Sequence, residues 1–152
     1  MSDPFLFDIT SPRFGLPLLF PGQAQKEAFV NEALALADAL LHCAVEGTRS
    51  DPPATPAEGE NWIVGASPTG AWIGQEGTIA CRQGGNWLFV APVDGLRLLD
   101  RATGQERRFH AGWHAATVPA LPTGGTTIDA EARNAIAGIV AALRAGGLLP
   151  PE

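Results

Sequence analysis

The sequence predicts an α+β protein in which a long N-terminal helix and a C-terminal helix flank a small antiparallel β meander or barrel. Apolar residues recur at helical spacing in two stretches, residues 22–47 and 126–152. Between them, residues 61–114 contain short apolar runs that glycine-rich turns separate at regular intervals. Linkers rich in proline and glycine, at residues 48–60 and 115–125, divide the three parts.

Residues 1–21 precede the first helix and are predicted to form an extended apolar arm. Four prolines, the last of them Pro21, prevent a regular helix in this segment. The large apolar side chains of the arm need a surface that covers them, which is either the arm's own domain or a neighbouring subunit. The candidate contact residues are Phe14, Leu16, Leu18, Leu19 and Phe20.

The first helix is predicted to run from Gly22 or Gln23 to Val45, with Gly47 as its C-terminal signal. Two adjacent apolar rows exceed the apolar face of about 100° that a surface helix needs. The remaining, mostly polar stripe consists of Asn31, Ala35, Asp38, His42 and Glu46. The surplus apolar surface predicts burial on two sides, against the domain or against copies of the chain. We expect an interface between copies at Phe29, Val30, Ala33, Leu34, Leu36, Ala37, Leu40 and Leu41.

The central part is predicted to be a set of short antiparallel strands. The linker before it, residues 48–60, contains too much proline for a helix or a central strand. Turn signals such as Asp94-Gly95 separate the apolar runs. The predicted strands are Asn61–Val64, Ala71–Ile73, Gly77–Arg82, Trp87–Ala91, Leu96–Asp100 and Glu106–His110.

The last helix is predicted to start at Thr126 or Thr127, with Thr126 and Asp129 as a capping box, and to end at Gly146. A helix of this length is marginal on its own. It therefore needs a packing partner, either the first helix or the same helix in other subunits. Its apolar row consists of Ala132, Ile136, Ile139 and Leu143.

Composition and charge narrow the classes of partner. The formal net charge of −6 disfavours DNA or an anionic membrane, because phosphate binding needs clustered lysine and arginine. The two cysteines do not make a secreted disulfide scaffold, and no apolar run of about 18 residues exists. One local basic cluster, interpreted as a solvated hairpin, consists of Arg97, Arg101, Arg107 and Arg108.

The sequence contains no catalytic constellation that we recognise. His110 and His114 have a spacing that binds metal on a helix, but Gly112 argues against a helix and no third ligand is nearby. The Gly-x-Ser-x-Gly elbow and a phosphate-binding loop with its lysine are missing. We therefore expect no catalytic residues, no metal and no cofactor.

The four tryptophans allow a second class of function, because exposed aromatic rings stack on sugars. The alternative is that they build the core of the β domain, since tryptophan is largely buried on average. The candidate glycan-binding residues are Trp72 with Gln75 and Trp87 with Asn86.

Four motifs between Pro12 and Gly95 resemble one domain family. They read PGQAQKEAFVNEAL, PPATPAEGENWIVG, TGAWIGQEGTIA and GNWLFVAPVDG. In order and spacing they are similar to an uncharacterised family in tail and fibre proteins of tailed bacteriophages and of alphaproteobacterial gene transfer agents. Many members carry histidine where this chain has Glu27, and many are longer fibres.

The resemblance implies a non-enzymatic structural protein of the virion tail, made in the bacterial host cytoplasm. Because tail fibres are usually trimeric, the expected partners are further copies in a homotrimer and other tail or baseplate proteins. The alternative function is a carbohydrate-binding module for host-surface polysaccharide, and a more distant one is a cell-wall hydrolase. Neither nucleic acid binding nor membrane insertion is expected.

Overall fold

A computed structural model of the protein describes residues 11–13, 18–19, 27–126 and 128–151. These residues form an α+β fold with two α-helices, α1 (Glu27–Leu40) and α2 (Ala130–Ala145), and eight short strands. The strands form two mixed sheets that do not close into a barrel, with the orders β1-β6-β7-β8 and β2-β3-β4-β5. Their bounds are β1 Ala44–Val45, β2 Thr48–Arg49, β3 Asn61–Val64, β4 Ile79–Gln83, β5 Asn86–Val90, β6 Arg97–Asp100, β7 Gln105–Phe109 and β8 Trp113–His114.

The first helix ends at Leu40, five residues before the predicted end. His42 has a φ of 45°, in the left-handed region, where a helix cannot continue. The chain then supplies one two-residue strand to each sheet, because β1 pairs with β6 and β2 pairs with β3. Both pairings are parallel, and both come from residues 44–49, before the predicted β region. The strands within residues 61–114 pair with one another antiparallel, as predicted.

The predicted strands are largely confirmed within the central part. Strand β3 has the predicted bounds, and β4, β5, β6 and β7 lie within two residues of theirs. The prediction of a strand at Ala71–Ile73 is wrong, because Gly70–Trp72 forms a 3₁₀ turn. The three two-residue strands β1, β2 and β8 were not predicted.

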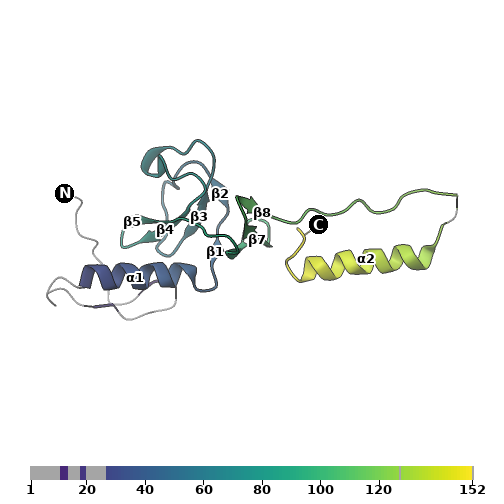
Figure 1. Cartoon of the computed structure of the whole chain (residues 1–152), viewed down its shortest axis with the longest axis horizontal. Helices are drawn as coiled ribbons and strands as arrows, with labels where there is room; N and C mark the ends of the chain where they lie inside the picture. The colour runs from purple at the N-terminus through teal and green to yellow at the C-terminus, as the bar shows by residue number, and fades with distance from the viewer. Residues whose placement is uncertain (1–10, 14–17, 20–26, 127, 152) are drawn as a thin grey trace.

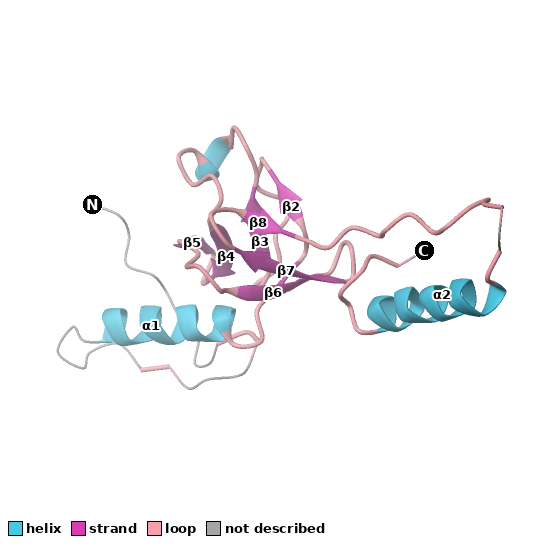
Figure 2. Ribbon diagram, turned by 45° about the vertical axis from the view of Figure 1, so that its right-hand side comes forward, coloured by secondary structure: helices cyan, strands magenta, loops and turns pink. Residues whose placement is uncertain are grey.

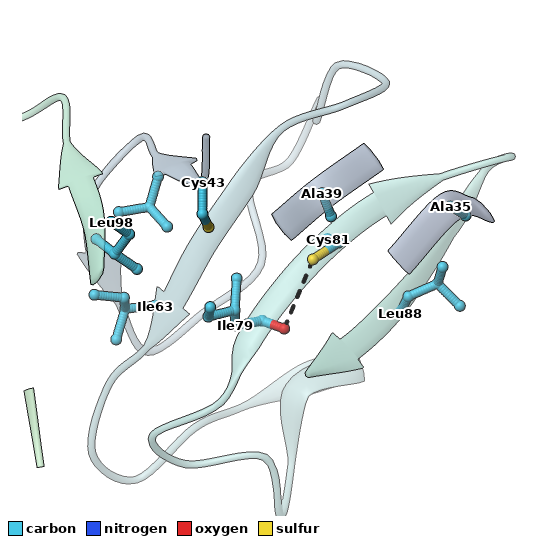
Figure 3. Close-up of a cluster of buried hydrophobic side chains, with 9 residues drawn as sticks. Ala35, Ala39, Cys43, Ile63, Ile79, Cys81, Leu88 and Leu98 are labelled. Carbon is cyan, nitrogen blue, oxygen red and sulfur yellow. Dashed lines mark hydrogen bonds between the residues drawn. The ribbon is translucent and has the colours of Figure 1, made fainter. Parts of the chain in front are cut away.

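The main core lies between α1 and the two sheets (Figure 3). Ala35 and Ala39 are the helix residues in it, and their small side chains let the helix approach the strands that carry Cys81 and Leu88. A second core cluster lies on the other face of the β2-β3-β4-β5 sheet, since alternate residues of a strand point to opposite faces. It consists of Val64, Trp72 and Ala80, with Trp62, Trp87 and Phe89 packed against them.

The C-terminal part extends away from the sheets. Figure 1 and Figure 2 both show α2 beside the long connector that leaves β8, on the opposite side of the sheets from α1. The helix starts at Ala130 rather than at Thr126 or Thr127, with the Asp129 carboxylate accepting the Ala132 N–H at 2.9 Å. No helix in the described ranges combines the length and the apolar character that crossing a membrane requires.

Candidate functional site

Two residues of the mostly polar stripe of α1, Asn31 and Asp38, bind the arm. Asn31 is 3% exposed, and its amide accepts the Leu19 N–H at 2.8 Å and donates to the Leu19 carbonyl at 2.9 Å. Leu18 beside it is buried. Leu18 and Leu19 therefore pack on the arm's own domain, whereas Phe14, Leu16 and Phe20 lie outside the described residues.

Asp38, two helical turns after Asn31, binds the arm at residues 11–13. It is 1% exposed, and its carboxylate accepts the Ser11 hydroxyl at 2.7 Å and the Arg13 N–H at 3.0 Å. Residue spacing predicted only that Asp38 and Asn31 lie on a mostly polar stripe, and it did not predict that they bind the arm. The available signal was the spacing of seven residues, which puts two short polar side chains on one face of a helix.

The Arg13 guanidinium caps the C-terminus of α1. It donates to the carbonyls of Asp38 and Ala39 at 2.7 Å, of Leu41 at 3.2 Å and of His42 at 3.1 Å. The last carbonyls of a helix lack partners within the helix, and they attract cations. No basic residue lies in the last turn of α1 itself, so the arm supplies the missing cation.

Only part of the predicted interface on α1 is exposed. Leu36 and Leu40 are half-buried and pack against the main core of their own chain. Leu34 is half-buried as well. The residues left on the outer face are Phe29, Val30, Ala33, Ala37 and Leu41, of which Phe29 is 78% exposed.

A second exposed apolar face lies on α2. Ile136, Ile139 and Leu143 are 40%, 60% and 36% exposed. Val140 is the residue of this helix that is buried. On the same side of the helix as Val140, Arg133 donates to the carbonyls of Pro122 and Gly124, which ties the helix to the connector.

Gln105 joins the two ends of the C-terminal part to the sheet. Its side chain is buried, and its amide nitrogen donates to the Ala116 carbonyl at 2.9 Å and to the Leu148 carbonyl at 3.4 Å. The Glu106 N–H donates to the Gly147 carbonyl at 2.8 Å. Gln105 and Glu106 of β7 thus hold both the start of the connector and the segment that follows α2.

The tryptophans do not form an open sugar platform. Trp72 is fully buried, so it offers no ring face for stacking. Its ring meets Trp87 edge-to-face at a centroid distance of 5.1 Å, and the Arg82 guanidinium lies 5.4 Å from the Trp87 ring centroid. Asn86 is exposed in the turn before Trp87, where its amide donates to the Gly84 carbonyl, while Gln75 is half-buried and its backbone carbonyl accepts the Thr78 hydroxyl.

The two histidines do not converge on a metal. His110 Nδ1 lies 3.0 Å from the Asp94 carboxylate, and His114 Nε2 donates to the His110 carbonyl at 2.9 Å. The hydrogen bond from the Ala111 N–H lowers the pKa of Asp94 most, and the hydrogen bond with the His110 side chain lowers it further. In the part of the chain that the structure describes, no group of three histidine, cysteine or acidic residues could hold a metal ion.

The arginines of the basic cluster have different surroundings. Arg101 pairs with Glu46 at 2.6 Å, and Arg107 pairs with the buried Asp100 at 2.6 Å. Arg97 and Arg108 instead line an open hollow of about 320 Å³ on the sheet that contains β7. The other lining residues are Glu106, Arg107, His114, Ala115, Ala116 and Leu148.

Comparison with known proteins adds one finding about the central part of the chain. A family model described as "Protein of unknown function (DUF2793)" matches residues 30–114. The matched region contains most of α1 and all eight strands, and it ends before α2. No curated protein matches the sequence.

Proposed function

This chain belongs to the DUF2793 family, and we propose that it is a structural component of a virion tail, from a phage or a gene transfer agent. Two lines support the proposal. The four motifs between Pro12 and Gly95 resemble tail and fibre proteins, and most of that segment lies inside the matched region. The exposed apolar faces of both helices are typical of a subunit that assembles with others.

The observation that carries the proposal is the exposed apolar row of α2. Its members follow one another at intervals of four, three and four residues, which is the spacing of a coiled-coil seam. The helix is about 24 Å long and lies apart from the sheets, so its own domain leaves this row uncovered (Figure 1). The row consists of Ala132, Ile136, Ile139 and Leu143.

In the proposed mechanism α2 joins subunits into a homotrimer. The outer face of α1, around Phe29, contacts another tail or baseplate protein. The arm packs on α1 and stabilises it. This arrangement assigns assembly to α2, because Leu36 and Leu40 of α1 already belong to the core of their own domain.

The first test is the solution mass by light scattering of the purified full chain. We expect a mass near three times 15.9 kDa. Ile139→Glu should yield a monomer, since a carboxylate in a helix interface loses its water without gaining a partner. Asn134→Glu adds the same charge on the opposite, exposed side of the helix and should leave the trimer intact.

Two results would contradict the assembly role: a stable monomer of the unmodified chain, or an Ile139→Glu variant with an unchanged mass. The tail location has a separate readout. Antibodies against the chain should label the tails of purified particles in electron micrographs, and labelling of capsids alone would contradict that location.

A further inference from the structure

The outward face of the β1-β6-β7-β8 sheet carries three basic residues in one row. Arg97 of β6 lies directly opposite Arg108 of β7, and Arg108 lies directly opposite His114 of β8. Directly opposite residues of an antiparallel pair point to the same face, with Cβ atoms about 5 Å apart. All three residues are exposed. We call them the basic row.

The charges of the basic row are poorly compensated within the protein. Like charges directly opposite each other destabilise a strand pair. Among the described residues, the basic row makes one ion pair, a long one in which Arg97 Nη1 lies 3.6 Å from Glu106 Oε2. The structure therefore holds two guanidinium groups side by side, with Glu106 paired to Arg97 and the Asp94 carboxylate close enough to Arg108 to interact with its charge.

The surroundings of the basic row form a shallow site. The hollow of about 320 Å³ has the basic row and Glu106 on the sheet, and Ala115, Ala116 and Leu148 beside them. Leu148 belongs to the C-terminal segment that Gln105 holds against β7. A ligand in this hollow would meet cations on the sheet and apolar groups at its side.

We propose that the basic row binds an acidic polysaccharide, a linear sugar chain with carboxylates on its residues. Guanidinium groups bind carboxylates through paired, charge-assisted hydrogen bonds. Neighbouring strands are about 4.8 Å apart, so the Arg97 and Arg108 guanidinium groups lie close enough for carboxylates of one sugar chain to meet both. Nucleic acid is disfavoured, because its phosphates need a large basic surface and this chain has a net charge of −6.

The inference rests on the proposed function only for its setting, a particle surface that meets bacterial polysaccharide. It places sugar binding on the sheet face of β6, β7 and β8, away from Trp72 and Trp87. Glu106 opposes the ligand in this site, since its carboxylate competes for Arg97.

The test measures fluorescence anisotropy of a labelled hexamer of galacturonic acid with the full chain. Arg108→Gln should weaken binding about fivefold, and Glu106→Gln should tighten it severalfold. Arg101→Gln is the matched control, because it removes the same charge from the same hairpin at a residue paired with Glu46. Its affinity should equal that of the unmodified chain, and salt should weaken binding in every variant.

Several outcomes would overturn the inference. They are no binding by the unmodified chain, equal losses in Arg101→Gln and Arg108→Gln, and equal affinity for a neutral glucose hexamer or a single-stranded DNA hexamer. The gain expected from Glu106→Gln separates charge recognition from a folding defect. The solution mass keeps the two proposals apart: a trimer that does not bind contradicts this inference alone, and a monomer that binds contradicts the assembly role alone.

Discussion

Single residues show how strongly surroundings change a side chain's role in this protein. Cys43 and Cys81 both lie in the main core, and the Cys81 thiol faces the Ile79 carbonyl, with Sγ and O 3.9 Å apart (Figure 3). Burial raises the pKa of Cys43, and it raises the pKa of Cys81 to about 12. Both behave as small apolar residues, as a buried free cysteine commonly does.

The buried thiols should be unreactive in the folded protein. At about pH 8 neither thiol should react with Ellman's reagent, because the thiolate is the reactive form and burial disfavours it. Both should react within seconds in guanidinium chloride, where they regain ordinary surroundings. Absorbance at the wavelength of the released chromophore measures the reaction. Rapid labelling of one thiol per chain without denaturant would contradict the burial described here.

At the scale of elements, α1 depends on a segment far from it in sequence. Its C-terminal carbonyls are capped by Arg13, and its buried polar residues Asn31 and Asp38 bind the arm. Among the described residues, α2 is held just after its C-terminal end by the bond from Gln105 to the Leu148 carbonyl, and along one side by the connector. Its apolar row lies exposed. The two helices therefore have different roles, one in the fold and one at the surface.

Replacement of Arg13 should destabilise the folded state through α1. Arg13→Gln leaves several helix carbonyls without their donor, and we expect a loss of about 1–2 kcal/mol in the free energy of unfolding. Urea denaturation followed by circular dichroism measures it. Arg101→Gln breaks an exposed ion pair and should cost less than about 1 kcal/mol. Equal stability of Arg13→Gln and the unmodified chain would show that the arm does not support the helix.

At the scale of the whole molecule, the two sheets separate two kinds of surface. Figure 1 shows α1 at one side of the sheets, and α2 with its connector extended at the other. The exposed apolar side chains of α2 are uncovered in a single chain. In the proposed assembly, association covers this face and stabilises a 16-residue helix that is marginal on its own.

Association should make the stability of the whole chain depend on its concentration. The melting temperature should rise across an about hundredfold increase in protein concentration, because a folded oligomer is favoured by mass action. Circular dichroism at each concentration measures the change. Ile139→Glu should remove the dependence, whereas Asn134→Glu should keep it. A melting temperature that stays constant for the unmodified chain would contradict assembly through α2.

Local patterns in the sequence were sufficient to predict most elements. Strand β3 and the region of both helices follow from residue spacing and from turn residues, which act within a few positions of the chain. The α+β class and membership of an uncharacterised family were also predictable from the sequence. The apolar row of α2 could be read from spacing alone, although its exposure could not.

The burial of individual side chains depends on contacts between residues that are distant in the sequence, and local patterns did not predict it. Periodicity gave α1 two apolar rows and a polar stripe, yet Asn31 and Asp38 are buried because the arm supplies their hydrogen-bond partners. Trp72 is fully buried because it packs in the second core cluster with Val64 and Ala80. The sequence by itself therefore determined which segments are helical or extended, since those preferences are local. The fold decided which faces are covered, because burial is set by the segments that pack there.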